Sequence, residues 1–169
     1  MLRVRPDFEK MSVAEKVEQL GDPSLAFRLA VVNYLADQGG EAVIGAVRVA
    51  MKKAKASGDL RAGGLWILER LGVLTDAELV GAAGDSDRLL RTHALRIVVE
   101  RGDWKATDLA MVLRGLEDED GFVARVAADG RRTLPSCTPT RSTSPRARCT
   151  GECPRAPAPI GATFGGSAR

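Results

Sequence analysis

The sequence predicts an all-α fold built from stacked helix pairs, and three observations carry this prediction. Apolar residues recur at helical spacing in each segment between residues 12 and 130. Glycines separate these segments at places where helices commonly end. Each predicted helix is amphipathic and too short to be stable alone, so we expect its apolar face to pack against neighbouring helices. Aromatic residues make up only 4% of the chain, so aliphatic side chains must fill the core.

The stretch of residues 61–102 shows the pattern most clearly, because it reads as a long, a short and a long helix. Glycines end the three helices at positions 72, 84 and 102. Thr75 and Glu78 are spaced as a capping box for the short helix, and Asp85 is predicted to cap the last one. The predicted buried positions are Leu65, Trp66, Leu68, Leu71, Leu79, Val80, Leu90, Ala94, Leu95, Ile97 and Val98.

The N-terminal third begins with a predicted extended lead-in at residues 1–11. Ser12 and Glu15 form a second predicted capping box, and Asp22-Pro23 is predicted to start the next helix. A further helix is expected from Glu41 to about Ala56, with lysines near its C-terminus that complement the helix dipole. The predicted buried positions are Val13, Val17, Leu20, Leu25, Phe27, Ala30, Val31, Tyr34, Leu35, Val43, Ile44, Val47 and Met51.

The C-terminal third continues the pattern and then loses it. A helix is predicted from Thr107, an acidic turn at residues 117–120, and a last helix that carries Phe122, Val123 and Val126. Residues 131–169 are rich in Pro, Arg, Ser, Thr and Gly and are expected to be disordered. The sequence therefore divides into a lead-in (1–11), a helical repeat domain (12–130) and a tail (131–169), which is either a natural basic linker or an out-of-frame reading.

Four arginines recur at the spacing of a repeat. Arg28, Arg61, Arg91 and Arg125 are separated by 33, 30 and 34 residues, and small or modest side chains follow three residues later, at Val31, Gly64, Ala94 and Ala128. This spacing predicts a right-handed α-solenoid of about four helix pairs. We expect the arginines to bind capping carboxylates and loop carbonyls between repeats, in preference to lining a groove for an acidic partner.

Three phrases carry a family resemblance: G-D-P-S-L-A-F-R-L-A, A-G-D-S-D-R-L-L-R-T-H-A-L-R and E-D-E-D-G-F-V-A-R-V-A-A. They resemble the D-x-x-x-x-[VL]-R-x-x-A second helix of HEAT-type repeats, including the short bacterial variety. The resemblance covers about residues 12–130 and implies the solenoid fold.

A narrower resemblance rests on A-G-G-L-W-I-L-E-R-L-G-V-L followed by R-T-H-A-L-R. These phrases are similar to the HEAT segment of large bacterial proteins described as membrane-bound dehydrogenases. Those proteins join a sugar-dehydrogenase-like propeller and a c-type haem domain to the HEAT array, and this chain contains neither. The narrower resemblance would place the parent protein in the cell envelope or periplasm. The chain as it stands has no signal peptide or apolar span, and is therefore expected to be cytoplasmic.

The net charge of the predicted helical part argues against binding of nucleic acid. Residues 1–130 hold 18 Lys and Arg against 21 Asp and Glu, a net charge of −3, whereas residues 131–169 hold seven Arg and one Glu. The sequence pI of about 9.0 therefore belongs to the tail.

No set of residues in the sequence is typical of a catalytic, cofactor or metal site. Cys149 and Cys153 lack the spacing and the His of haem attachment, and only Cys137 could join them at a zinc ion that needs four ligands. His93 is the only histidine and is expected to be structural. Trp66 is expected to pack in the core, whereas Trp104 is a candidate exposed partner-binding residue, together with Arg28, Arg61, Arg91 and Arg125.

The sequence hypothesis for function is a non-catalytic scaffold or protein-binding module, which belongs to a larger multidomain protein and binds a protein partner or that protein's other domains. A nucleic-acid-binding or DNA-glycosylase-like HEAT protein is one alternative, and a lyase-like or maturation-factor HEAT protein is another. Because a solenoid needs polar end caps, the last repeat is expected to expose an apolar surface and to favour self-association. That surface would include Leu113, Leu116, Phe122 and Val126.

Overall fold

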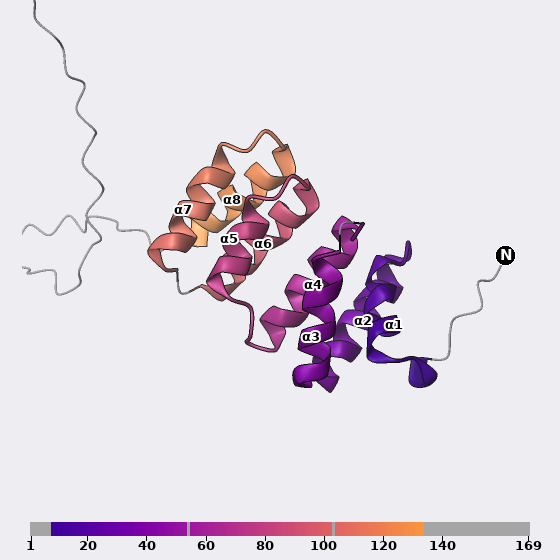
Figure 1. Ribbon diagram of the computed structural model, residues 1–169. Coiled ribbons are helices and arrows are strands. Elements are labelled where there is room, and N and C mark those ends of the chain that lie inside the picture. Colours follow the sequence, from indigo (N-terminus) through magenta and orange to yellow (C-terminus); the bar gives the residue numbers. More distant parts are fainter. Residues whose placement is uncertain (1–7, 54, 103, 134–169) are drawn as a thin grey trace, which may run out of the picture. The chain divides into compact units, whose positions relative to one another are not determined.

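The computed structural model describes residues 8–53, 55–102 and 104–133, and the side chains within them up to Gly130. This part of the chain is all-α and contains no strand, as the sequence predicts. Two short 3₁₀ helices, Phe8–Lys10 and Gln19–Gly21, flank the first α-helix. The α-helices are α1 (Val13–Glu18), α2 (Leu25–Gln38), α3 (Gly40–Met51), α4 (Gly58–Arg70), α5 (Asp76–Ala83), α6 (Arg88–Arg101), α7 (Ala106–Leu116) and α8 (Gly121–Thr133) (Figure 1).

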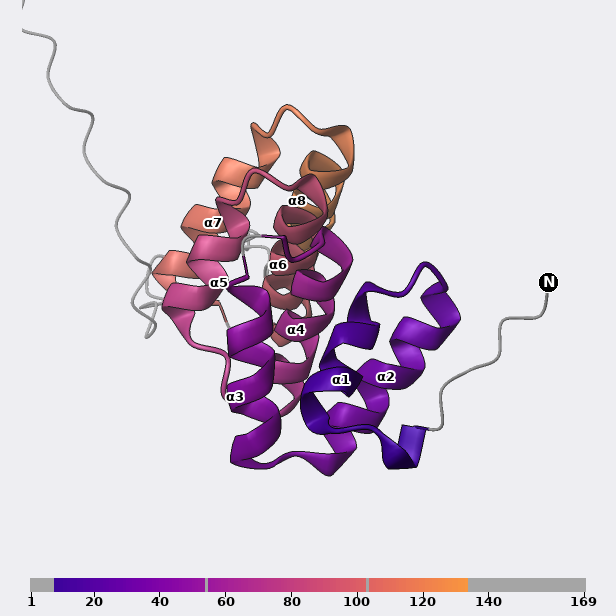
Figure 2. The same ribbon diagram turned by 45° about the vertical axis from the view of Figure 1, so that its right-hand side comes forward.

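Consecutive helices pack together in pairs, and the pairs contact one another mainly through their second members. Helix α2 packs against α4, α4 against α6, and α6 against α8. On the other side α1 packs against α3, and α5 against α7. Figures 1 and 2 show the even-numbered helices side by side in this order. They therefore form a continuous layer across all four pairs.

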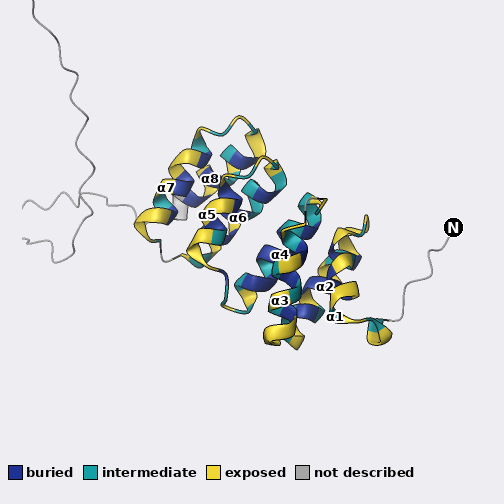
Figure 3. Ribbon diagram, viewed as in Figure 1, coloured by how far each residue is buried: buried dark blue, intermediate teal, exposed yellow. Residues whose placement is uncertain are grey.

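The core lies between the two members of each pair and between neighbouring pairs, where buried and exposed positions alternate at helical spacing (Figure 3). Gly64 shows how closely the helices approach. A Cβ atom at this position would lie 2.6 Å from the Sδ atom of Met51 and 3.2 Å from a methyl group of Val47. Glycine therefore lets α4 pack directly on α3. The largest fully buried side chains are Leu20, Leu35, Leu65, Ile67, Leu68, Leu79, Leu95 and Ile97.

Both predicted capping boxes are confirmed. The Ser12 hydroxyl accepts a hydrogen bond from the Glu15 amide, and the Glu15 carboxylate accepts one from the Ser12 amide. Thr75 and Glu78 make the same reciprocal pair at the start of α5. The hydrogen bond from the Ser12 hydroxyl to the Glu15 carboxylate holds the pKa of that exposed carboxyl below its ordinary value.

Two predicted helix starts are wrong by about two residues. Asp87, not Asp85, is the N-cap of α6, and its carboxylate accepts from the Leu89 amide. Asp85 instead accepts from the Asp87 amide and so fixes the turn before the cap. Asp22 likewise accepts from the amide of Ser24, which precedes the first residue of α2. Asp22 and Asp85 therefore each form an Asx turn, and the helix begins after that turn.

Other differences concern the ends of elements. The lead-in at residues 1–11 is not wholly extended, because Phe8–Lys10 form a 3₁₀ turn whose Phe8 ring packs edge-on against Phe27 and Tyr34. Helix α3 ends at Met51, five residues before the predicted Ala56. Helix α8 runs to Thr133, beyond the predicted domain end at residue 130.

The helices belong to one unit of residues 1–135, and residues 136–169 make up a second. Cys137, Cys149 and Cys153, and the predicted disorder of the tail after residue 133, lie outside the described residues. Within the described part, no helix combines the length and apolar character needed to cross a membrane.

Candidate binding site

Three of the four predicted arginines lie at equivalent positions in the layer of even-numbered helices, and each reaches forward to the next even-numbered helix. Arg28 of α2 pairs with Asp59 in the first turn of α4, at 2.9 Å. Arg61 of α4 pairs with Asp85, at 2.7 Å, in the turn before α6. These arginines therefore occupy the seams between helix pairs.

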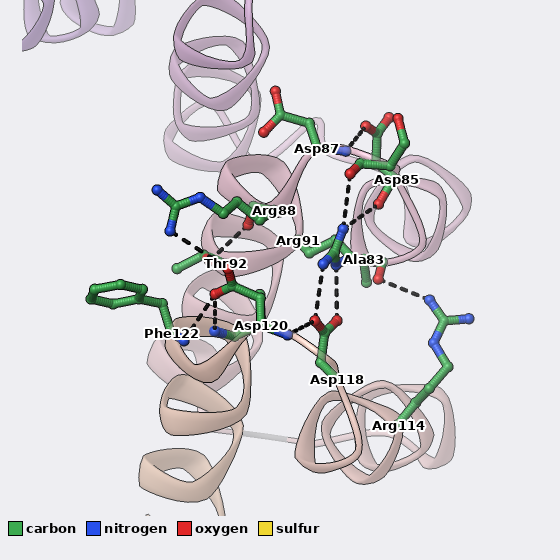
Figure 4. Close-up of polar contacts among 12 residues, drawn as sticks. Ala83, Asp85, Asp87, Arg88, Arg91, Thr92, Arg114, Asp118, Asp120 and Phe122 are labelled. Carbon is green, nitrogen blue, oxygen red and sulfur yellow. Dashed lines mark hydrogen bonds and ion pairs between the residues drawn. The ribbon is translucent and has the colours of Figure 1, made fainter.

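Arg91 makes the most complete of these contacts. Its Nε and Nη2 atoms donate to the two carboxylate oxygens of Asp118 at 2.8 and 2.9 Å, and its Nη1 atom donates to the carbonyls of Asp85 and Ser86 (Figure 4). Only 11% of the Arg91 side chain and 14% of the Asp118 side chain are exposed. The hydrogen bonds from Arg91 hold the pKa of Asp118 below its ordinary value. One guanidinium thus joins the loop before α6 to the loop before α8.

Arg125, the fourth arginine of the predicted series, does not lie at the position of α8 that is equivalent to Arg91 of α6. The buried residues Leu90 and Ala94 of α6 have their equivalents 33 residues later, at Val123 and Ala127 of α8. The position equivalent to Arg91 is therefore Ala124, and Ala128, the small residue three positions after Arg125, is exposed. Arg125 is exposed and makes no ion pair with a side chain that the structure describes.

A second set of arginines, which the sequence analysis did not identify, joins neighbouring even-numbered helices near their C-terminal ends. Arg101 of α6 reaches back to Glu69 of α4, with its Nε atom 2.8 Å from the carboxylate. Arg70 of α4 reaches back to Asn33 and Asp37 of α2. The signal was present in the sequence, since Arg70 and Arg101 stand 31 residues apart at the ends of two predicted helices.

Trp104 is half-buried, and its ring packs against α8. A Cβ atom at Gly130 would lie 3.2 Å from the Trp104 ring. The indole nitrogen is buried and has no hydrogen-bond acceptor among the described residues. Trp104 therefore presents only part of its ring to a partner.

His93 and Trp66 form a pair between α6 and α4. The indole N–H of Trp66 donates to Nδ1 of His93 at 3.0 Å, so the histidine is neutral with its proton on Nε2. Burial lowers the pKa of His93 below its ordinary value, the positive charge of Arg96 lowers it further, and Asp59 opposes the shift.

The His93 pair predicts a pH dependence of stability. Because its pKa is lower in the folded protein, the unfolded chain takes up the proton first as the pH falls. The contribution of neutral His93 to the free energy of unfolding is therefore fully present above the ordinary pKa of 6.5. It is lost as the pH falls through the pKa of His93 in the folded protein. Between about pH 7.5 and about pH 5, the free energy of unfolding measured in urea should fall further for wild type than for His93→Gln, since glutamine keeps an acceptor but does not titrate. Equal drops would contradict this assignment, because the carboxylates titrate alike in both proteins.

An apolar groove of about 340 Å³ crosses three of the even-numbered helices beside this pair. Helix α2 contributes Leu25, Leu29 and Val32, which lie on one face at i, i+4 and i+7. Helix α4 contributes Gly63 and Trp66, and a Cβ atom at Gly63 would lie 3.2 Å from a methyl group of Leu20. Leu25 and Leu29 are 60% and 53% exposed, so the prediction that Leu25 is buried is wrong.

The rim of the groove is positively charged. Arg28, Arg70 and Arg96 line it, and Asp59 is the one carboxylate among the lining residues that the structure describes. Asp59 is occupied by its ion pair with Arg28. Arg96 is exposed and makes no ion pair with any described side chain, and the Arg70 side chain is 44% exposed. Two arginines therefore face solvent beside an apolar floor.

Other apolar side chains are exposed singly. Leu113 and Phe122, two of the four residues expected at an uncovered end, are 51% and 64% exposed, whereas Leu116 and Val126 pack partly against the core. The Phe122 ring is covered on one side by Arg88, whose guanidinium carbon lies 5.5 Å from the ring centroid. Val80 is also 41% exposed, contrary to prediction.

The described residues contain no group of three or more His, Cys, Asp and Glu side chains placed to hold a metal ion. A comparison of the chain with protein-family models and with curated proteins finds no match. The geometry of the groove is thus the observation on which a functional assignment depends.

Proposed function

We propose that this protein is a non-catalytic helical-repeat scaffold that binds a protein partner in the groove across α2, α4 and α6. The observation that carries the proposal is the pair of leucines, Leu25 and Leu29, exposed one turn apart beside a recessed floor formed by Val32, Gly63 and Trp66. Apolar side chains gathered in a groove are typical of binding sites, whereas single exposed ones are not.

We further propose that the helix pairs are HEAT-like repeats of a right-handed α-solenoid. Three arginines at equivalent positions, each paired with a carboxylate in the first turn of the next even-numbered helix or in the loop before it, support this proposal. The resemblance of the sequence around these arginines to HEAT-type second helices also supports it. In such an array the second helices line one continuous surface, which suits an extended protein partner.

Site-specific photocrosslinking tests the proposed binding surface. A photoreactive side chain at position 29 should form adducts with a partner in cells, and the same side chain at position 49 should not. Val49 is a matched control because it is 65% exposed on α3 and does not line the groove. The partner identified from the adduct should bind Leu29→Asp about tenfold more weakly than wild type, and Val49→Asp within about twofold. Equal labelling from both positions, or no adduct from position 29, would refute a binding role for the groove.

A further inference from the structure

We infer that the groove recognises an acidic segment of another protein, one that carries bulky apolar side chains flanked by Asp or Glu. This inference rests on the proposed function and adds the chemistry of the partner. It depends on two properties of the same groove, its apolar floor and its unbalanced positive charge.

The apolar part of the groove selects for bulky side chains. Leu25 and Leu29 are more than half exposed, and Val32 and Trp66 extend the apolar surface between them and α6. Covering these two leucines would remove apolar surface from water, and this burial contributes to the binding free energy. The volume of about 340 Å³ lies at the small end of the range for ligand pockets, which suits a few side chains of a peptide.

The charged part of the groove selects for carboxylates. Arg70 of α4 and Arg96 of α6 are both exposed, and the one carboxylate on the described rim, Asp59, is bound to Arg28. Arg70 also contacts Asn33 and, at 3.5 Å, the exposed carboxylate of Asp37, whereas Arg96 makes no ion pair with a described side chain. A partner carboxylate here would gain charge-assisted hydrogen bonds from a guanidinium without displacing a strong internal pair. A basic partner would instead be repelled by Arg96, which has no carboxylate partner among the described side chains.

The same charge argues against two other occupants. The chain's own residues 131–169 carry seven Arg and one Glu, so the rim would repel them. An anionic bilayer would match the charge, but the floor formed by Val32, Gly63 and Trp66 is recessed between three helices, where a flat surface does not reach it. A peptide segment satisfies both the charge and the shape.

Selection from a random peptide library tests the inference without knowledge of the partner. Phage-displayed peptides of about sixteen residues would be selected on the full chain, after depletion on Leu29→Asp. The selected sequences should combine bulky apolar residues with a net negative charge. In fluorescence anisotropy, a synthetic peptide from this set should bind about tenfold more weakly to Leu29→Asp and to the double variant Arg70→Glu/Arg96→Glu, and its affinity should fall as salt rises. Val49→Asp should bind it within about twofold of wild type.

Charge reversal provides the most direct control. The same peptide with its acidic residues changed to lysine should fail to bind wild type and should regain affinity for Arg70→Glu/Arg96→Glu. Because the four substituted side chains, Leu29, Val49, Arg70 and Arg96, are exposed, each variant should keep the wild-type circular dichroism spectrum.

The possible outcomes distinguish recognition of an acidic segment from the broader proposal that the groove binds a protein. Selection of neutral or basic peptides that still depend on Leu29 would overturn acidic recognition and leave protein binding in place. Failure to select any Leu29-dependent peptide would overturn both. Vesicles of anionic phospholipid that bind wild type but not Leu29→Asp would assign the groove to a membrane, and a dimer lost in Leu29→Asp would assign it to a second copy. Either result would overturn the inference.

Discussion

Replacing Leu95 with alanine is expected to lower the free energy of unfolding by about 3 kcal/mol or more. Leu95 lies on α6 and is only 2% exposed. A Cβ atom at Gly115 of α7 would lie 2.6 Å from a Leu95 methyl group and 3.1 Å from Ala127 of α8. The leucine therefore fills the space where three helices meet. The shortened side chain would leave a cavity there, and glycine and alanine neighbours offer little to fill it.

Leu29→Ala is the matched control for Leu95→Ala, because the substitution is the same but the leucine is 53% exposed in the groove. Its cost should stay below about 1 kcal/mol, since little of its apolar surface is removed from water in the folded protein. Chemical denaturation of both variants measures the difference. Similar costs for the two substitutions would mean that Leu29 serves the fold, and the case for a binding role would be lost.

The features that the sequence predicts correctly are local. The capping boxes at Ser12 and Thr75 need only two side chains three residues apart, and both form as predicted. Helix α6 is also correct at every predicted buried position, because it packs between α4 and α8 and its apolar stripe has partners on both sides. The spacing of apolar residues is sufficient to predict buried positions wherever neighbouring helices cover the whole apolar stripe.

The groove could not be predicted because periodicity does not say what covers a face. Helix α2 carries one stripe of Phe27, Val31 and Leu35, which is buried, and a second that includes Leu25 and Leu29. Both stripes have helical spacing, so the sequence alone does not distinguish the core face from the binding face. The second stripe faces the groove that Gly63 and Trp66 of α4 also line, and there Leu25 and Leu29 stay 60% and 53% exposed.

The misplaced Arg125 has a related cause. Matching the arginine by residue type gives a spacing of 34 from Arg91, whereas the buried positions and the turn aspartates repeat after 33. Asp118 and Asp120 make the same Asx-turn and helix-start hydrogen bonds as Asp85 and Asp87. The aspartates that cap the turns, and not the arginines, mark the equivalent positions of α6 and α8. Their role is visible only from the backbone hydrogen bonds that they accept.

Replacing Arg91 with alanine is expected to lower the free energy of unfolding by about 3 kcal/mol, because it leaves Asp118 without its partner in a site that is 14% exposed. Arg91→Lys keeps the charge but loses the bidentate geometry, and should recover only part of this loss. Arg88→Ala on the same helix is the matched control. The Arg88 side chain is 62% exposed and lies 3.5 Å from Asp120, so its removal should cost no more than about 1 kcal/mol. Urea denaturation of the three variants at neutral pH measures these differences. If Arg91→Ala costs no more than Arg88→Ala, Arg91 does not hold α6 and α8 together, and other contacts must stabilise this seam.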